Sequence, residues 1–446
     1  MTAFRPICLL SALALILLAV SPAYAQTLSE TLVRAYQDNH GLIAARIQLK
    51  ESDESIPQAK ANLRPTLTAS GSATLSHSDP LPGDAEGNES ASVGLDLSQN
   101  LYRGGRTMAG IEQAELTLLA ARASLASIEQ SVLLAAATAY LDVIRDEAML
   151  ALNKKNEAVL TRHLQAARDR FQVGEITRTD VSQAESRLAG AKASRIGAEG
   201  TLEASRAVFE REIGIMPRKL AEPDAPTGLP GSLTEAIDTA FNHNPTLAVA
   251  EFTERAAKAG IDVQFGALLP TVSLSASTSH AWATSGDISD SGSISASVSI
   301  PLYQSGGTAS ALREAKLTAN RRRIEINETR SIVRQETIAA WEGHRSAKAA
   351  IGARNIQVDT ARIAMEGVEQ EALVGARTTL DVLDAEQELL NAEVELVRGL
   401  RDEQVAAYLL LSAIGKLTAS DMNLMVEPYD IRAHADTVAD RWWGLE

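Results

Sequence analysis

Two pairs of short segments alternate between apolar and polar side chains. In residues 66–76, leucine, alanine and glycine occupy one set of alternate positions, and serine and threonine occupy the other. Similar alternation runs through residues 90–101, 271–281 and 293–302. A period of two residues is that of a β-strand, and a tilted strand of about 9–11 residues is long enough to cross a bilayer. The pattern predicts four strands, each with one apolar face and one hydroxyl-rich face.

Half-buried strands of a soluble β-sandwich show the same alternation. The apolar positions here include many small residues, whereas a sandwich core draws on larger side chains. Lipid against the apolar face and water against the hydroxyl face suit both faces. We therefore expect membrane strands.

Long helices are expected after each strand pair. Residues 105–171 and 307–374 contain no proline, and a helix of about 67 residues would be about 100 Å long. Such a helix requires lateral packing, as in a coiled coil. Shorter helices should follow over residues 180–212 and 381–414.

Helical segments are also expected before the strands, over residues 28–63 and 233–268, and Pro57 should kink the first of them. In the last helix of the chain, apolar residues recur every seven positions from Leu383 to Val397, as in a coiled-coil seam.

The chain repeats itself at a nearly constant offset. Leu101-Tyr102, which a glycine pair follows, recurs 201 positions later as Leu302-Tyr303, and Val173-Gly174 recurs at the same offset as Val374-Gly375. We infer an internal duplication. Its expected parts are a first repeat over residues 26–216, a linker rich in proline and glycine over 217–232, a second repeat over 233–417 and a C-terminal tail over 418–446.

Four strands cannot close on themselves in a bilayer, because open edges would leave backbone groups without hydrogen bonds. Three chains of four strands each would give twelve strands, enough for a barrel with a water-filled lumen.

The first 25 residues have the features of a secretory signal peptide. Arg5 precedes an apolar run over residues 7–20, and Ala23-Tyr24-Ala25 is an A-x-A cleavage site that would leave Gln26 first. The run is shorter than the roughly 20 residues of a membrane helix, which disfavours the alternative of a retained anchor. After the cleavage site, no stretch is expected to approach a membrane helix in apolar length.

Composition excludes several classes of protein. The chain has 42 Lys and Arg against 57 Asp and Glu, a formal net charge of −15, so it is a poor general binder of nucleic acid. Its single cysteine, Cys8, excludes a disulfide scaffold and a cysteine-based zinc site. Nucleophile, metal-ligand, phosphate-loop and dinucleotide motifs are absent from the sequence. We predict no enzyme activity, cofactor or metal.

Two polar turns join the long helices to the shorter ones that follow. Glycine is expected to end each long helix in a left-handed conformation, and Thr-x-x-Asp is a capping box for the next helix. The residues concerned are Val173, Gly174, Thr177, Thr179 and Asp180 in the first turn, and Val374, Gly375, Arg377, Thr378 and Asp381 in the second.

These features together resemble the TolC family of outer-membrane efflux channels. The resemblance extends from Leu28 to about Leu417 and rests on the duplicated order of elements, on the LYRGG and LYQSGG turns, and on VGARTTLDVLDAEQELLNA at residues 374–392. It implies a mixed α and β membrane protein: a homotrimer with a twelve-stranded β-barrel in the outer membrane of a Gram-negative bacterium, continued by an α-helical tunnel through the periplasm.

The same resemblance implies partners. They are a periplasmic adaptor (membrane fusion) protein, which would dock at the hairpin tips, and an inner-membrane ABC or proton-driven transporter. The N-terminus without a lipid-anchoring cysteine and the stretch DESIPQAKANLRPTL at residues 53–67 look more like the type I secretion branch than the lipid-anchored drug-efflux branch.

Asp381 and Asp384 are three residues apart and should share a helix face. Three chains would bring six such carboxylates around one axis, where mutual repulsion is expected to raise some of their pKa values. By resemblance, both line a periplasmic gate, and Arg377 ties neighbouring hairpins through Thr179 and Asp180. The simpler alternative is that Asp381 only caps its helix.

One position departs from the family pattern, because the family's tyrosine three residues before the second tip glycine is Ala372 here.

Two rival functions belong to different classes. An enzyme would need a site that no motif indicates. An exported structural coiled-coil or adhesin-like surface protein would account for the helices but not for strand pairs that repeat in step with them.

Overall fold

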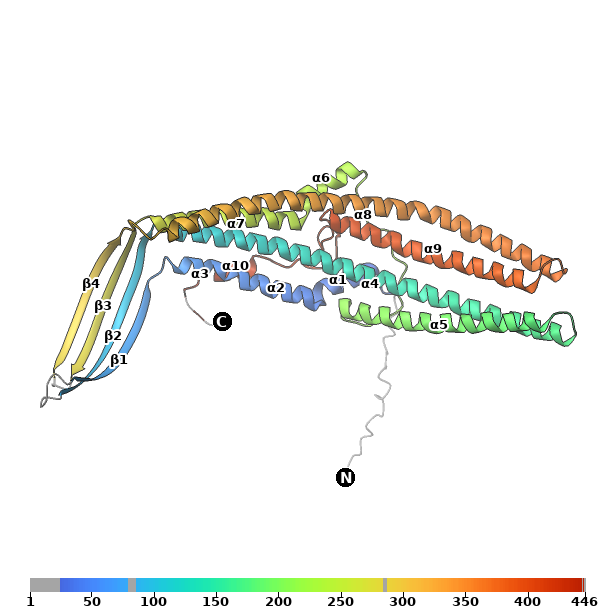
Figure 1. The fold of residues 1–446 in the computed structure, drawn as a ribbon, viewed down its shortest axis with the longest axis horizontal. Coiled ribbons are helices and arrows are strands. Elements are labelled where there is room, and N and C mark those ends of the chain that lie inside the picture. Colours follow the sequence, from blue (N-terminus) through green and yellow to red (C-terminus); the bar gives the residue numbers. More distant parts are fainter. Residues whose placement is uncertain (1–24, 79–85, 284–286, 443, 445–446) are drawn as a thin grey trace, which may run out of the picture.

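The molecule is elongated, with a β-sheet at one end and long helices running away from it (Figure 1). This computed structural model describes residues 25–78, 86–283, 287–442 and 444. All of the predicted signal peptide except Ala25 lies outside the described residues. The predicted class, a mixed α and β protein with long helices, is confirmed.

The four strands form one antiparallel sheet in the order β1-β2-β3-β4. Their bounds are Thr66–Ser78 for β1, Glu86–Arg103 for β2, Thr271–Ala283 for β3 and Ile288–Ser299 for β4. The central pairing, β2 with β3, joins the two halves of the chain and contains one irregularity between Asn100 and Tyr102. In the chain, β1 and β4 are the two edges of the sheet.

The two faces of the sheet are chemically distinct. Across β3 and β4 the polar face is a ladder of serine pairs, with hydroxyl oxygens 2.8–2.9 Å apart from Ser273–Ser297 to Ser279–Ser291. The opposite face carries aligned apolar residues, including the row Leu67, Leu97, Ala276 and Ile294. Because strands have a period of two, this separation follows directly from the sequence.

The last strand ends earlier than predicted. We expected a strand over residues 293–302, but β4 stops at Ser299. Pro301 has no backbone N–H to donate to a sheet ladder, so the chain leaves the sheet before it.

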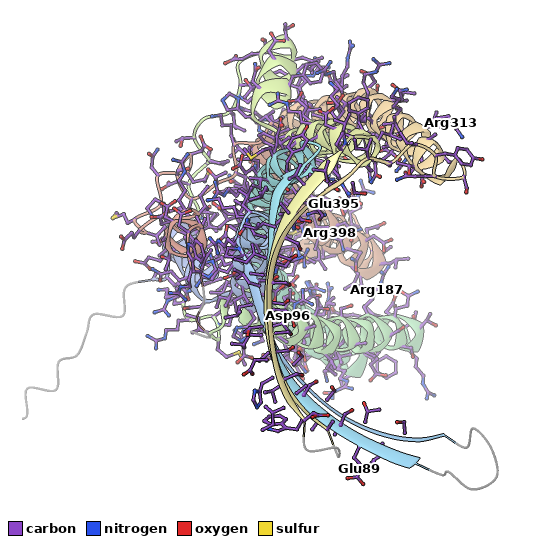
Figure 2. The ribbon with its side chains drawn as sticks, turned by 90° about the vertical axis from the view of Figure 1, so that its left-hand side faces the viewer. Glu89, Asp96, Arg187, Arg313, Glu395 and Arg398 are labelled. Carbon is purple, nitrogen blue, oxygen red and sulfur yellow. The ribbon has the colours of Figure 1, made fainter. Side chains whose placement is uncertain are left out.

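Two helical hairpins continue from the sheet. The first consists of α4 (Arg106–Gln172) and α5 (Arg178–Ile213), and the second of α8 (Gly307–Leu373) and α9 (Thr379–Ala413). Both hairpin tips lie at the end of the molecule opposite the sheet (Figure 1). Seen along the molecule from the sheet end, Arg187, Glu395 and Arg398 lie on the side toward which the sheet curves (Figure 2).

The segments before the strands are broken where the sequence analysis expected continuous helices. The first comprises α1 (Leu28–Asp38), α2 (His40–Asp53) and α3 (Ser55–Ala61); the second comprises α6 (Leu233–His243), α7 (Pro245–Phe265) and the 3₁₀ turn η1 (Gly266–Leu268). The predicted interruption by Pro57 is present. The helix breaks at Glu54, between α2 and α3, because Pro57 has no N–H to donate to the carbonyl of Asp53, four residues earlier, and its ring crowds that carbonyl.

Asparagine caps cause two of the breaks. The Asn39 side chain accepts hydrogen bonds from the N–H groups of Gly41 and Leu42 at the start of α2, and Asn244 accepts one from Thr246 at the start of α7. An asparagine oxygen satisfies N–H groups that a helix start leaves unpaired, so each asparagine stabilises a new helix.

The largest core lies where α1, α4, α5 and α9 meet, and it includes several fully buried alanines of α4. One expectation needs correction here. Among the described residues, α4 is long and apolar enough by length and composition to cross a membrane. It packs along its length against α5, α7 and α9, and part of its most apolar window is buried there.

The C-terminal tail returns toward the sheet. It contains α10 (Ala433–Val438), which packs against α2, and its end lies near α3 (Figure 1).

Candidate functional site

The two hairpin tips have the same backbone geometry. Gly174 and Gly375 have φ values of 78° and 81°, in the left-handed region that side chains with a Cβ disfavour. Their N–H groups donate to the carbonyl oxygens of Phe171 and Ala372 over 3.0 and 3.1 Å. Each glycine therefore ends a long helix in the manner predicted from its position.

Capping boxes begin the helices that follow. The Thr177 side chain caps α5 and the Thr378 side chain caps α9, each accepting from the N–H of the aspartate three residues on. Each threonine also donates its hydroxyl to that aspartate over 2.8 Å. Asp180 and Asp381 are thus held against the tips by short, charge-assisted hydrogen bonds.

These hydrogen bonds shift the aspartates toward the ionised form. Hydrogen bonds from the Thr177 hydroxyl and N–H hold the pKa of Asp180 below its usual value. For Asp381, the Thr378 N–H and hydroxyl lower the pKa, and nearby Arg377 adds to the effect. Within one chain the pKa of Asp381 is therefore lowered, whereas a ring of carboxylates from three chains was expected to raise some of these pKa values. The capping alternative for Asp381 therefore has direct geometric support.

Arg377 has a partner on its own hairpin. Its Nε lies 2.8 Å from Oε2 of Glu371, and both side chains are about half exposed. The predicted tie to Thr179 and Asp180 runs between chains and stays a prediction. Sequence reasoning missed Glu371, although it precedes Arg377 by six residues across the tight turn at Gly375.

Asp384 has a basic partner in this chain. The predicted ring of carboxylates treated it as unpaired. Nη2 of Arg187 on α5 lies 2.6 Å from its Oδ1, with both side chains partly exposed. The ion pair joins the two hairpins near their tips. Arg187 was also missed, because pairing residues on separate hairpins requires knowledge of how those hairpins are rotated against each other.

A cavity of about 410 Å³ lies between the hairpins just behind the tips. Small side chains, Ala166, Ala167 and Ala372, form part of its wall. Nε2 of His163 and Oε1 of Glu386 also line it and lie 3.6 Å apart. Ala372 thus stands beside open space that a larger side chain could occupy.

Metal chemistry has no visible basis in the described part of the chain. Over those residues, no three His, Cys, Asp or Glu side chains are grouped so that they could hold a metal ion.

Comparison with known proteins gives a consistent result. A family model described as outer membrane efflux protein matches residues 31–213 and 236–416. Outer membrane efflux protein BepC of Brucella suis biovar 1 is 35% identical, with 95% of this chain and 92% of that protein covered. Outer membrane protein TolC of Vibrio cholerae serotype O1 is 26% identical over 90% of this chain and 93% of that protein.

Solved structures share the fold. A crystal structure of CusC superposes with a TM-score of 0.78 at 20% sequence identity, covering 88% of this chain and 92% of that one. The outer membrane protein VceC from Vibrio cholerae gives a TM-score of 0.73 at 22% identity, covering 87% of this chain and 96% of that one.

Proposed function

The chain belongs to the outer membrane efflux protein family, and we propose that it forms a trimeric channel through which substrates leave the cell passively. It is a TolC-family protein of the outer membrane and not an enzyme.

The trimer is proposed because the four-stranded sheet of one chain is open. Within the described residues, β1 and β4 are the edges of the sheet and each pairs with a strand on one side only, and the apolar face beside them is exposed. An unsatisfied backbone group in lipid costs several kcal/mol, so such edges must pair with another copy. Three copies would close a twelve-stranded barrel with the serine ladders facing water inside.

Exposed apolar residues on α8 support contacts between copies. Leu317 and Ile324 are seven residues apart, as are Ile356 and Ile363, and all four are exposed in the single chain. Seven-residue spacing is that of a coiled-coil seam. In a trimer these side chains would pack against a neighbouring chain and close a helical tunnel.

The tips are proposed to form the periplasmic gate. Asp381 and Asp384 would line it, and Arg377 would tie neighbouring hairpins through Thr179 and Asp180. The Arg187–Asp384 ion pair supplies a further tie within each chain. A closed gate would then depend on charge pairs that can be broken without unfolding the helices.

The same tips are proposed to dock a periplasmic adaptor. Val173 and Val374 are 71% and 82% exposed, unusual for valine, and they flank Gly174, Thr177, Gly375 and Thr378. An inner-membrane transporter would supply the energy, because the sequence has no phosphate-binding motif.

We propose a type I secretion system, with multidrug efflux as the alternative. Alkaline protease secretion protein AprF of Pseudomonas aeruginosa is 26% identical over 67% of this chain, while probable efflux pump outer membrane protein TtgC of Pseudomonas putida is 21% identical over 88%. A deletion strain separates the two. Loss of exported protein with unchanged drug sensitivity supports secretion; the reverse supports efflux.

Mass and conductance test the channel itself. The mature protein in mild detergent should have the mass of three chains by light scattering, and it should conduct ions in a planar bilayer. A monodisperse monomer with intact β-structure by circular dichroism would remove the basis of the barrel. Solubility in buffer without detergent, together with absent conductance, would instead favour the coiled-coil surface protein.

A further inference from the structure

The C-terminal tail is fastened to the outside of the helices before it reaches the sheet. The backbone N–H of Tyr429 donates to the Tyr36 hydroxyl over 2.9 Å. Nδ1 of His434 on α10 lies 3.1 Å from Oδ2 of Asp53, a carboxylate that is almost fully buried. These contacts direct the tail along α2 toward the base of β1 (Figure 1).

Two basic residues then hold the end of the tail. Nζ of Lys60 donates to the Ala439 carbonyl over 3.1 Å and pairs with Asp440 over 2.9 Å. Arg64 donates to the Arg441 carbonyl, and its guanidinium lies 4.9 Å from the centroid of the Trp442 ring. Since Arg64 precedes β1 by only two residues, Trp442 is held at the level where the strands begin.

Trp442 is nevertheless 69% exposed. Stacking and hydrogen bonding place the ring without covering it, which is costly for a large apolar side chain in water. Tryptophan is favoured where one end of the ring meets an apolar medium and the other meets water, as at a membrane interface.

Neighbouring residues have the composition of such an interface. The exposed apolar face of β1 starts at Leu67, three residues after Arg64. At the base of β2, Leu101 and Tyr102 are exposed as well. Basic side chains beside an aromatic ring suit phosphate groups and the glycerol region of phospholipids.

We propose that the tail end, residues 439–442, binds the phospholipid headgroups of the periplasmic leaflet, with Trp442 inserted at the interface and Lys60 and Arg64 facing lipid phosphate. This inference rests on the proposed placement of the strands in the outer membrane. The tail would then fix the height of the helices relative to the bilayer.

Tryptophan quenching tests the proposal. The full mature chain carrying Trp282→Phe, Trp341→Phe and Trp443→Phe keeps only Trp442. It is reconstituted into vesicles of phosphatidylethanolamine and phosphatidylglycerol, with bromine placed either near the headgroup end or near the methyl end of the acyl chains. We expect emission at shorter wavelength than in water, and stronger quenching by the shallow bromine. Unquenched emission at the wavelength of a water-exposed ring overturns the proposal.

A second single-tryptophan protein separates failure of this inference from failure of the channel. Keeping only Trp282, which lies on the apolar face in the row of Ala91 and Ile288, reports whether the strands are in lipid. Quenched Trp282 with unquenched Trp442 refutes the tail proposal alone. If neither is quenched, the membrane placement itself is wrong.

A matched pair of substitutions tests the role of the basic residues. In the Trp442 protein, Arg64→Ala should reduce quenching because it removes the hydrogen bond to the tail and the stacking partner of the ring. Lys50→Ala, which removes an exposed positive charge from α2, should leave quenching unchanged. Equal effects of both substitutions would mean that charge in general, rather than the held tail, attracts the lipid.

Discussion

Arg187 on α5 and Asp384 on α9 form an ion pair of 2.6 Å that joins the two helical hairpins of one chain close to their tips. Direct contact between α5 and α9 is otherwise sparse, because each helix packs mainly against its own hairpin partner. The pair therefore affects how the hairpins sit against each other more than how each one folds.

Breaking this pair should loosen the closed gate. An exposed ion pair contributes about 0.2–1 kcal/mol, so Arg187→Ala should raise the open fraction by up to about fivefold in single-channel recordings. Arg168→Ala is the control, because its 2.7 Å pair with Glu185 lies within the first hairpin. Equal effects of the two substitutions would argue against a tie between hairpins.

Arg377 should tie chains together in addition to its pairing within the hairpin. Arg377→Ala should raise single-channel conductance because both contacts are lost. Glu371→Gln removes only the contact within the chain and should leave the resting conductance near that of the wild type. A rise of the same size in Glu371→Gln would mean that the contact inside the hairpin is the one that matters, and that Asp180 of a neighbour is not the partner.

The alternating faces of β3 predict alternating reactivity. The mature chain has no cysteine, because Cys8 lies in the predicted signal peptide. Single cysteines at Ser273, Ser275 and Ser277 should react with a water-soluble thiol reagent. Cysteines at Val272, Leu274 and Ala276 should be protected in lipid. Uniform labelling along the segment would contradict a membrane strand.

Tyr140 should contribute to stability through its buried hydroxyl. That oxygen lies 2.8 Å and 2.7 Å from the carbonyl oxygens of Gln26 and Ala221, and burial raises the pKa of Tyr140 to about 12. Tyr140→Phe should cost about 1 kcal/mol and lower the apparent melting temperature. The exposed Tyr303 provides the control, since Tyr303→Phe should leave the apparent melting temperature unchanged.

The pKa shift adds a pH dependence with a definite sign. Folding favours the neutral phenol, so this stabilisation is fully present below the unfolded pKa near 10 and is lost as pH rises through about 12. The stability difference between wild type and Tyr140→Phe should therefore narrow in strongly alkaline buffer. A constant difference would mean that the hydroxyl is not the cause.

The sequence allowed prediction of those features that depend on short-range periodicity. A period of two determines which face of each strand is apolar. The repeated glycine and Thr-x-x-Asp spacing predicts where each long helix ends and where the next helix begins at the tips. The break at Asn39 was also within reach, because asparagine is a strong helix cap and is followed here by His-Gly. It was missed because the apolar pattern continues across it.

Other features depend on how distant segments are arranged. The partners Arg187 and Asp384 are 197 positions apart, and their contact requires a particular rotation of one hairpin against the other. The cavity beside Ala372 depends on the same rotation. The position of the tail likewise depends on contacts such as Lys60 with Asp440, which no local pattern encodes.

The aspartates of the second tip should bind divalent cations at the periplasmic entrance. Asp381→Ala with Asp384→Ala should weaken block by divalent cations added on that side, because a ring of carboxylates concentrates them. The difference from wild type should fade at about 1 M salt, where the screening length falls to about 3 Å. Hydrogen bonds from the Thr378 N–H and hydroxyl lower the pKa of Asp381, so the charge that this carboxylate contributes to block should be present at neutral pH and be lost as pH falls through its lowered pKa.

A control must show that divalent block depends on where the removed carboxylates lie, and not on net charge alone. Glu314→Gln with Glu328→Gln removes two exposed carboxylates from the part of α8 nearest the sheet, so it changes net charge equally without touching the tips. Divalent block should survive in this variant. If the Asp381 and Asp384 double variant also kept wild-type block at low salt, Asp381 would be a helix cap and Asp384 a partner of Arg187. The cation-binding constriction would then have to involve other residues, because neither aspartate would face the conducting path.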